Sequence, residues 1–121
     1  MFLIDKNDKI FIAGAKGMVG SAIKRKLKEY HYENLECPSR EELDLANTEL
    51  VSKWFKEKKP SVVILAAAKV GGIYANNKYP VDFLLENLKI QNNVIEAAFN
   101  FGVRRFLFLG SSCIYPKFAG Q

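Results

Sequence analysis

The chain has 121 residues and a mass of 13.7 kDa, which suits one domain or a piece of one. Hydrophobic residues make up 49% and charged residues 26% of the sequence, and this balance excludes a disordered tail, a collagen-like fibre or a mucin-like stalk. The net charge of +5 comes partly from cations clustered at positions 24–28 and 53–59. Acids lie close to these cations and stacking aromatics do not alternate with them, so we expect solvated helix faces and no nucleic-acid partner.

The sequence indicates neither a membrane protein nor a secreted one. The longest apolar run, residues 62–68, falls well short of the ~20 residues of a membrane span. Asp5 and Lys6 interrupt the apolar start of the chain, which is not the pattern of a signal peptide. Cys37 and Cys113 lack the spacing of a metal site or a redox motif. We therefore expect a cytoplasmic protein with no membrane contact and no bound metal.

Apolar residues recur in alternating strand and helix patterns along the chain. Residues 9–13 and 35–37 predict two short strands, and the spacing at 18–30 predicts a helix between them. Asn47 is a suitable N-cap for a second helix, which ends at Lys59 before Pro60. The continuously apolar run at 62–68 is typical of a strand buried on both faces. A long helix at 80–100 and an apolar strand at 106–109 follow.

This βαβαβαβ order predicts class α/β, with a Rossmann-type doubly wound parallel sheet, right-handed crossovers and helices on both faces. Such a sheet usually has about six strands, and only four are predicted here. We therefore expect residues 1–121 to be the N-terminal part of an NADP-binding Rossmann domain, with the later strands and a C-terminal substrate domain outside the chain. The aromatic residues Phe99, Phe101, Phe106 and Phe108 are expected in the core.

Three glycines lie where the first strand becomes the first helix, in the segment Gly14-Ala15-Lys16-Gly17-Met18-Val19-Gly20. Gly14 suits a tight turn, Gly17 lets backbone N–H groups approach a phosphate, and Gly20 lets the helix pack closely. The positive end of the helix dipole adds attraction for an anion. A bland turn is the alternative, but the place between strand and helix favours a dinucleotide site.

The segment after the second strand indicates which dinucleotide is bound. An NAD site has an acid about 20 residues past the glycines, whereas this chain has Pro38-Ser39-Arg40. A hydroxyl and a guanidinium suit a 2′-phosphate, and Lys16 can add a second positive charge. The sequence therefore favours NADP(H) over NAD. The alternative is that Arg40 merely pairs with Glu41 or Glu42.

Three further features are specific enough to indicate a family. They are the segment Ala66-Ala67-Ala68-Lys69-Val70-Gly71-Gly72-Ile73-Tyr74-Ala75-Asn76-Asn77, the residue Asn87 in the predicted long helix, and the segment Gly110-Ser111-Ser112-Cys113-Ile114-Tyr115-Pro116. Together with the glycine segment they resemble the GDP-L-fucose synthase family of extended short-chain dehydrogenase/reductases, along the whole chain. The resemblance implies an NADPH-dependent enzyme that epimerises and then reduces a GDP-linked 4-keto-6-deoxy sugar, from GDP-4-keto-6-deoxy-D-mannose to GDP-L-fucose. It also implies a homodimer for the full-length protein.

The resemblance implies a role for each matching residue. Ser111 would hydrogen-bond the keto oxygen, and Cys113 would act as the epimerisation base or acid. The cofactor would be held by Gly14, Lys16, Gly17, Met18, Val19, Gly20, Ser39, Arg40, Asp44, Leu45, Ala66, Ala67, Ala68 and Asn87. The sugar would face Val70, Gly71, Gly72, Asn77 and Ser112. Lys16 departs from the family's more familiar arginine, which keeps the charge but loses the bidentate fork.

Other interpretations of the same residues remain open. Ser111 and Ser112 could form a strand-ending turn, and Cys113 could be a buried structural thiol. The family's Tyr-x-x-x-Lys pair does not follow Ser111, and Tyr74 with Lys78, which have that spacing, precede the long helix in a loop. We therefore expect the 121 residues alone to be inactive. The alternatives are a stand-alone NADP(H)-binding module, or another extended short-chain sugar-nucleotide epimerase or dehydratase.

Overall fold

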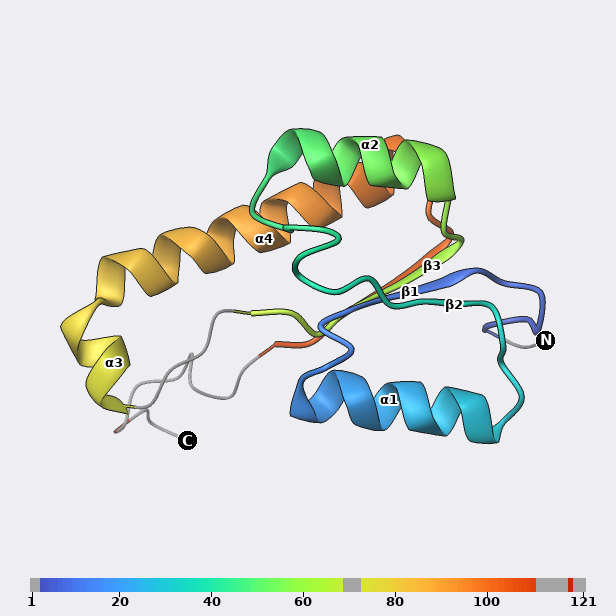
Figure 1. The fold of residues 1–121 in the computed structure, drawn as a ribbon, viewed down its shortest axis with the longest axis horizontal. Helices are drawn as coiled ribbons and strands as arrows, with labels where there is room; N and C mark the ends of the chain where they lie inside the picture. The colour runs from blue at the N-terminus through green and yellow to red at the C-terminus, as the bar shows by residue number, and fades with distance from the viewer. Residues whose placement is uncertain (1–2, 69–72, 111–117, 119–121) are drawn as a thin grey trace.

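A computed structural model of the chain describes residues 3–68, 73–110 and 118 (Figure 1). The elements in chain order are β1 (Ile10–Ala13), α1 (Met18–Glu29), β2 (Leu35–Glu36), α2 (Thr48–Lys58), β3 (Val62–Leu65), α3 (Ile73–Lys78), α4 (Pro80–Asn100) and β4 (Arg105–Phe108). Within the described residues, no helix is both long enough and apolar enough to cross a membrane.

The described strands form one parallel sheet in the order β2-β1-β3-β4. From β1 the chain moves to β2 on one side and later to β3 and β4 on the other, with α1 against one face and α2 and α4 against the opposite face (Figure 1). This arrangement confirms the predicted α/β class with a Rossmann-like sheet. Strands are added on one side of β1 first and on its other side afterwards, so the boundary between β1 and β3 is a topological switch point. Parallel sheets leave a crevice there, at the carboxyl ends of their strands.

The hydrophobic core has two parts because successive strand residues point to opposite faces of the sheet. On the α1 face, Ile10, Ile12, Val62 and Ile64 are buried and pack against side chains that include Ile23 and Leu27 of α1. On the other face lies a larger cluster, which consists of Phe11, Ala13, Leu43, Val51, Phe55, Val63, Leu65, Ile90, Val94, Ala97 and Ala98. The two parts fix the sheet between its covering helices.

The helix ends follow the predicted signals. The side chain of Asn47 accepts a hydrogen bond of 3.0 Å from the Leu50 amide and caps α2. Lys59 ends that helix in the left-handed conformation, with φ of 48°, directly before Pro60. The bounds of α4 agree with the prediction, with Pro80 in the first turn and Gly102 just after the end at φ of 73°.

Several expectations about the elements were wrong in detail. The segment before α4 contains α3 rather than a loop, so Tyr74 and Lys78 lie on a short helix. The strand expected over 62–68 ends at Leu65, because its partner β1 turns away after Ala13. The predicted strands at 9–13 and 35–37 are each one residue longer than β1 and β2, and β4 is shifted by one residue from the predicted 106–109.

The predicted core aromatics also need correction. Phe101 packs against the core, but Phe99 is 86% exposed and β4 is exposed at every residue. β4 is the edge strand of the described sheet, and Leu107 and Phe108 are about half exposed there. Their apolar pattern is that of a covered strand, so the pattern alone does not distinguish an edge from a centre.

A polar cluster ties the amino ends of the strands together, at the end of the sheet opposite to the crevice. Asp8 accepts a hydrogen bond of 2.8 Å from the Ser61 hydroxyl and forms an ion pair with Arg104. The Ser61 hydroxyl in turn accepts from the Lys9 amide at 3.1 Å. Partial burial raises the pKa of the Asp8 carboxyl, but hydrogen bonds from the Asp5 amide, Arg104 and Ser61 outweigh it and hold that pKa below its ordinary value.

Candidate cofactor-binding site

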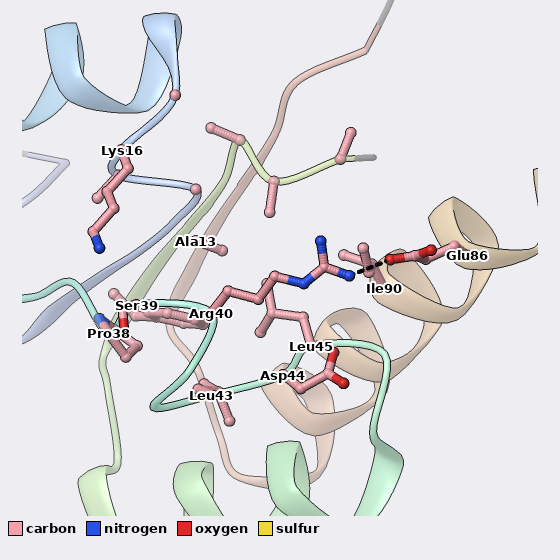
Figure 2. Close-up of a pocket in the computed structure, with 17 residues that line it drawn as sticks. Ala13, Lys16, Pro38, Ser39, Arg40, Leu43, Asp44, Leu45, Glu86 and Ile90 are labelled. Atoms are coloured by element: carbon pink, nitrogen blue, oxygen red, sulfur yellow. Dashed lines mark hydrogen bonds and ion pairs between the residues drawn. The ribbon is translucent and has the colours of Figure 1, made fainter. Parts of the chain in front are cut away.

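A cavity of about 250 Å³ lies at the switch point, beyond the carboxyl ends of β1 and β3 (Figure 2). Its walls come from the turn after β1, the loop between β2 and α2, the segment after β3, and one face of α4. The lining residues are Phe11, Ala13, Gly14, Ala15, Lys16, Gly17, Pro38, Ser39, Arg40, Leu43, Asp44, Leu45, Ala66, Ala67, Ala68, Glu86 and Ile90. A crevice in this place is where open parallel α/β sheets bind their ligands.

The glycine turn after β1 is built so tightly that side chains would not fit. Gly14 has φ of 86°, and a Cβ on it would lie 2.8 Å from backbone atoms of Ala66 and Ala67. A Cβ on Gly20 would lie 1.9 Å from the Gly14 carbonyl oxygen. The predicted reasons for these two glycines are confirmed, with one change: Gly20 packs on the turn itself. A Cβ on Gly17 would be 3.4 Å from its nearest neighbour, so the fold does not require glycine there.

Helix α1 begins at this turn without a side-chain cap. Its N-cap is Gly17, and its first turn holds no acid. By contrast, α2 has the Asn47 side chain as its cap and Glu49 in its first turn. Gly17 lines the cavity, so α1 begins at the cavity edge with the partial positive charge of its first amides uncompensated by a protein carboxylate or side-chain cap, which favours an anion nearby.

The loop on the opposite wall is held by a reciprocal pair of hydrogen bonds. The Ser39 amide donates to the Glu42 carboxylate at 2.6 Å, and the Glu42 amide donates to the Ser39 hydroxyl at 3.3 Å. This is the geometry of a capping box. It fixes Ser39 at the cavity wall.

Lys16 and Arg40 both act on a carboxyl in this corner. Hydrogen bonds from its own amide and from Ser39, together with the charges of Lys16 and Arg40, lower the pKa of the Glu41 carboxyl. Glu41 itself is exposed and does not line the cavity. A second anion that enters between Lys16 and Arg40 would meet the same cations.

The floor of the cavity is fixed by Asn93, the one buried polar residue of the described chain. Its amide nitrogen donates to the Leu45 carbonyl at 2.9 Å, and its carbonyl accepts from the Thr48 hydroxyl at 3.0 Å. Asp44, next to Leu45, accepts from the Ala46 amide at 3.0 Å through its side chain. These bonds hold the loop that carries Asp44 and Leu45 against α4, so that both residues line the cavity.

Arg40 reaches across the cavity to α4. One guanidinium nitrogen lies 2.7 Å from a carboxylate oxygen of Glu86. In Figure 2 the guanidinium points toward Glu86 and away from Lys16 and Ser39. The alternative considered from the sequence, a pair with Glu41 or Glu42, is therefore not what the structure shows: Arg40 does form an ion pair, but with a residue 46 positions away.

The structure brings most of the predicted cofactor residues into one wall or another of this cavity. The ten that line it are Gly14, Lys16, Gly17, Ser39, Arg40, Asp44, Leu45, Ala66, Ala67 and Ala68. Gly20 supports the turn from behind. Met18 and Val19 start α1 with exposed side chains, 86% and 46%, and do not line the cavity. Asn87 lies half-buried on α4 beside Glu86.

The predicted substrate and catalytic residues fall largely outside the described part of the chain. Six of them lie outside the described residues, so their predicted roles stay predictions: Ser111, Ser112, Cys113, Val70, Gly71 and Gly72. Asn77 is exposed on α3. Burial raises the pKa of the other cysteine, Cys37, although Lys24 and Lys28 oppose the shift. Among the described residues no group of acids, histidines and cysteines could hold a metal ion.

Sequence reasoning missed seven of the lining residues, namely Phe11, Ala13, Ala15, Pro38, Leu43, Glu86 and Ile90. Ala13, Ala15 and Pro38 adjoin predicted residues and could have been included as neighbours. Phe11 shares a sheet face with Ala13, two positions along the strand. Glu86 and Ile90 are one helical turn apart on α4, and only the packing of that helix brings them to the crevice.

Comparison with known proteins gives close relatives. The chain is 59% identical over 117 residues to "GDP-L-fucose synthase 1" of Arabidopsis thaliana and 50% identical over 113 residues to "GDP-L-fucose synthase" of Escherichia coli K12, which covers 97% and 93% of the chain. Among solved structures it resembles a GDP-mannoheptose C4 reductase from Campylobacter jejuni with NADP bound, at a TM-score of 0.92, 44% identity and 97% coverage. These matches confirm the predicted resemblance.

The chain spans little more than a third of each relative, namely 36% and 35% of the two synthases and 37% of the reductase. The sequence model of the NAD dependent epimerase/dehydratase family matches residues 10–121. That match includes the glycine turn, the loop with Ser39 and Arg40, and the segment after β3, so it covers every wall of the cavity. The chain therefore belongs to the NAD dependent epimerase/dehydratase family.

Proposed function

We propose that the cavity at the switch point binds NADP(H), and that the chain is the N-terminal, cofactor-binding part of an epimerase-reductase of GDP-linked 4-keto sugars. One observation carries the proposal. The glycine turn up to Gly17, the N-cap of α1, and the Ser39–Arg40 loop line the same cavity from opposite walls. The glycine turn at the start of a helix suits the pyrophosphate of a dinucleotide, and the Ser39–Arg40 loop suits a 2′-phosphate. A solved relative with NADP bound, 44% identical to this chain, supports the choice of cofactor.

Each wall has a part in this binding. The amides at the start of α1 hold the pyrophosphate, and Gly14 keeps the turn close enough for them to face it. Ser39, Arg40 and Lys16 form the subsite for the 2′-phosphate through one hydroxyl and two cations. The adenosine lies between the Asp44–Leu45 loop and Ala66–Ala68, where the cavity lining is mainly apolar. When bound, NADPH supplies the hydride that reduces a ketone.

For the substrate we propose GDP-4-keto-6-deoxy-D-mannose, which is converted to GDP-L-fucose. Identities of 59% and 50% to proteins named GDP-L-fucose synthase support this choice. In this proposal Ser111 hydrogen-bonds the keto oxygen and Cys113 moves the proton at the carbons next to it. Protons alpha to a ketone are acidic enough for a side-chain base.

The full-length protein is proposed to be a homodimer that uses α4. Five large apolar side chains on that helix are 44–86% exposed, namely Val81, Leu84, Leu85, Ile95 and Phe99. The rest of α4 packs on the sheet through Ile90, Val94, Ala97 and Ala98. A second copy of the helix would cover the exposed apolar residues.

The cofactor proposal is tested by titrating the full gene product with NADPH and with NADH and following nicotinamide fluorescence. We expect saturable binding of NADPH, with NADH at least about tenfold weaker, because the charged contacts to the 2′-phosphate are lost. Equal affinity for the two, or binding to neither, contradicts the proposal. Turnover of GDP-4-keto-6-deoxy-D-mannose then tests the reaction. Cofactor binding without turnover favours a stand-alone binding module.

A reductase of another GDP sugar is the second candidate. The 44% identity to a GDP-mannoheptose C4 reductase favours it. The two activities differ in whether protons are exchanged before the reduction. In deuterated water, an epimerase-reductase incorporates deuterium at both inverted carbons of the sugar, whereas a pure C4 reductase leaves them unlabelled. Mass spectrometry of the product distinguishes the two.

A further inference from the structure

The ion pair between Arg40 and Glu86 bridges two walls of the cavity that are far apart in the sequence. Arg40 comes from the loop after β2, and Glu86 from the second turn of α4. The Glu86 side chain is only 19% exposed, whereas that of Arg40 is 72% exposed. The carboxylate is thus fixed by packing on its helix, and the arginine is the partner that is free to swing.

The direction of the Arg40 side chain matters for the phosphate subsite. Ser39 and Lys16 lie at one end of the cavity, and the guanidinium lies at the other end, on Glu86 (Figure 2). A 2′-phosphate that contacts the Ser39 hydroxyl would therefore find the guanidinium already held by a carboxylate. Phosphate accepts two parallel hydrogen bonds from arginine and carries more charge than a carboxylate, so it can displace Glu86.

We propose that Glu86 is a specificity-determining residue that competes with the 2′-phosphate of NADP(H) for the Arg40 guanidinium. Arg40 exchanges between two anions, the Glu86 carboxylate in the cofactor-free protein and the phosphate in the complex. Because this ion pair must break before Arg40 can bind the phosphate, its presence lowers the affinity of the wild-type protein for NADP(H). A dinucleotide without the 2′-phosphate leaves Arg40 on Glu86 and is not affected. This inference rests on the proposed binding of NADP(H) in the cavity.

The test compares Glu86→Gln with a control on the same helix, Glu96→Gln, in the full gene product. Both variants remove one negative charge, but Glu96 is exposed and does not line the cavity. We expect Glu86→Gln to bind NADPH about two to five times more tightly than the wild type, because an ion pair with an exposed arginine contributes up to about 1 kcal/mol. NADH affinity should change no more than in Glu96→Gln. Glu86→Ala should act in the same direction as Glu86→Gln.

A second pair of variants separates competition from a general charge effect. In an Arg40→Ala background no guanidinium is shared, so adding Glu86→Gln should no longer raise the NADPH affinity. If the gain persists there, Glu86 acts only by repelling the cofactor, and the inference is overturned. It is also overturned if Glu86→Gln weakens NADPH binding, has no effect, or tightens NADH equally. If the wild type binds neither dinucleotide, the proposed function itself fails, which is a different result from all of these.

Discussion

Gly20 lies so close beneath Gly14 that any side chain on it would collide with the turn. A Cβ there would come within 1.9 Å of the Gly14 carbonyl oxygen, and that atom belongs to the backbone and has no flexible end to move aside. We therefore expect Gly20→Ala to force the turn or the helix start out of place. The variant should lose at least about 2 kcal/mol of unfolding free energy, as overpacked sites do, together with measurable NADPH binding.

Gly17→Ala is the matched control for this prediction. Its Cβ would have its nearest contact at 3.4 Å, and its φ of −72° suits any residue. The unfolding free energy should change by less than about 0.5 kcal/mol, while NADPH binding weakens because the methyl group intrudes where the amides face the cofactor. Equal stability losses in both variants, measured by urea denaturation, would contradict the packing argument for Gly20.

Arg40→Ala tests the subsite for the 2′-phosphate. A charged hydrogen-bond partner of phosphate is worth ~1.5–3 kcal/mol, so we expect NADPH affinity to fall by roughly 10- to 100-fold. NADH affinity should stay within about twofold of the wild type, because no contact to a phosphate is lost. Arg25→Ala, which removes an exposed cation from α1, should change neither affinity. Calorimetric titration of both dinucleotides decides the matter, and a parallel loss of NADPH and NADH binding would count against the assignment.

Asn93→Ala should destabilise the fold and the cavity floor together. The variant leaves the Leu45 carbonyl and the Thr48 hydroxyl without their buried partner. Thr48 is exposed and its hydroxyl can bond to water instead, so we expect a loss of about 1–3 kcal/mol, mainly from the unsatisfied Leu45 carbonyl. Asn92→Ala, an exposed neighbour on the same helix, should have little effect. Chemical denaturation of the two variants provides the comparison, and equal stability would contradict the role given to Asn93.

The Asp8 cluster predicts how stability depends on pH. The pKa of Asp8 in the folded chain lies below its ordinary value, so the carboxylate stabilises the fold above the unfolded pKa of about 3.9, and this stabilisation is lost as pH falls through the folded value. Asp8→Asn should therefore be less stable than the wild type at pH 7. The difference between the two should shrink as the pH falls below about 4. A difference that stays constant from pH 7 to pH 3, measured by thermal unfolding, would show that Asp8 acts through shape alone.

The fold could be predicted from the sequence wherever a local signal and the tertiary environment agree. The bounds of α4 follow from Pro80 and Gly102, and the end of α2 follows from Pro60. The short helix α3 was missed because its residues Ala75-Asn76-Asn77 lack apolar periodicity and asparagine is a poor helix former. The apolar pattern of Phe106 and Phe108 looks alike at the edge and in the centre of a sheet, so the pattern alone predicts a core position and not their exposure.

The residues of the site also differ in whether a local sequence signal predicts them. The glycine turn and the Ser39–Arg40 loop have local signatures, because the residues that form a tight turn or contact a phosphate are neighbours in the sequence. The partner of Arg40 has no such signature. Glu86 comes to the cavity only because α4 packs on the sheet through Ile90 and Val94, and nothing near Arg40 in the sequence indicates that contact.

The single tryptophan among these 121 residues lies beside the crevice wall, and this gives the chain a built-in optical reporter. The Trp54 ring is 4.4 Å from that of Phe11, centroid to centroid, and Phe11 lines the cavity. A dihydronicotinamide absorbs where indole emits, so a reduced cofactor held there should quench the indole emission by resonance energy transfer. The oxidised cofactor, which does not absorb in that range, should leave the emission far less changed, so the intensity of the tryptophan emission would report the redox state of the bound cofactor.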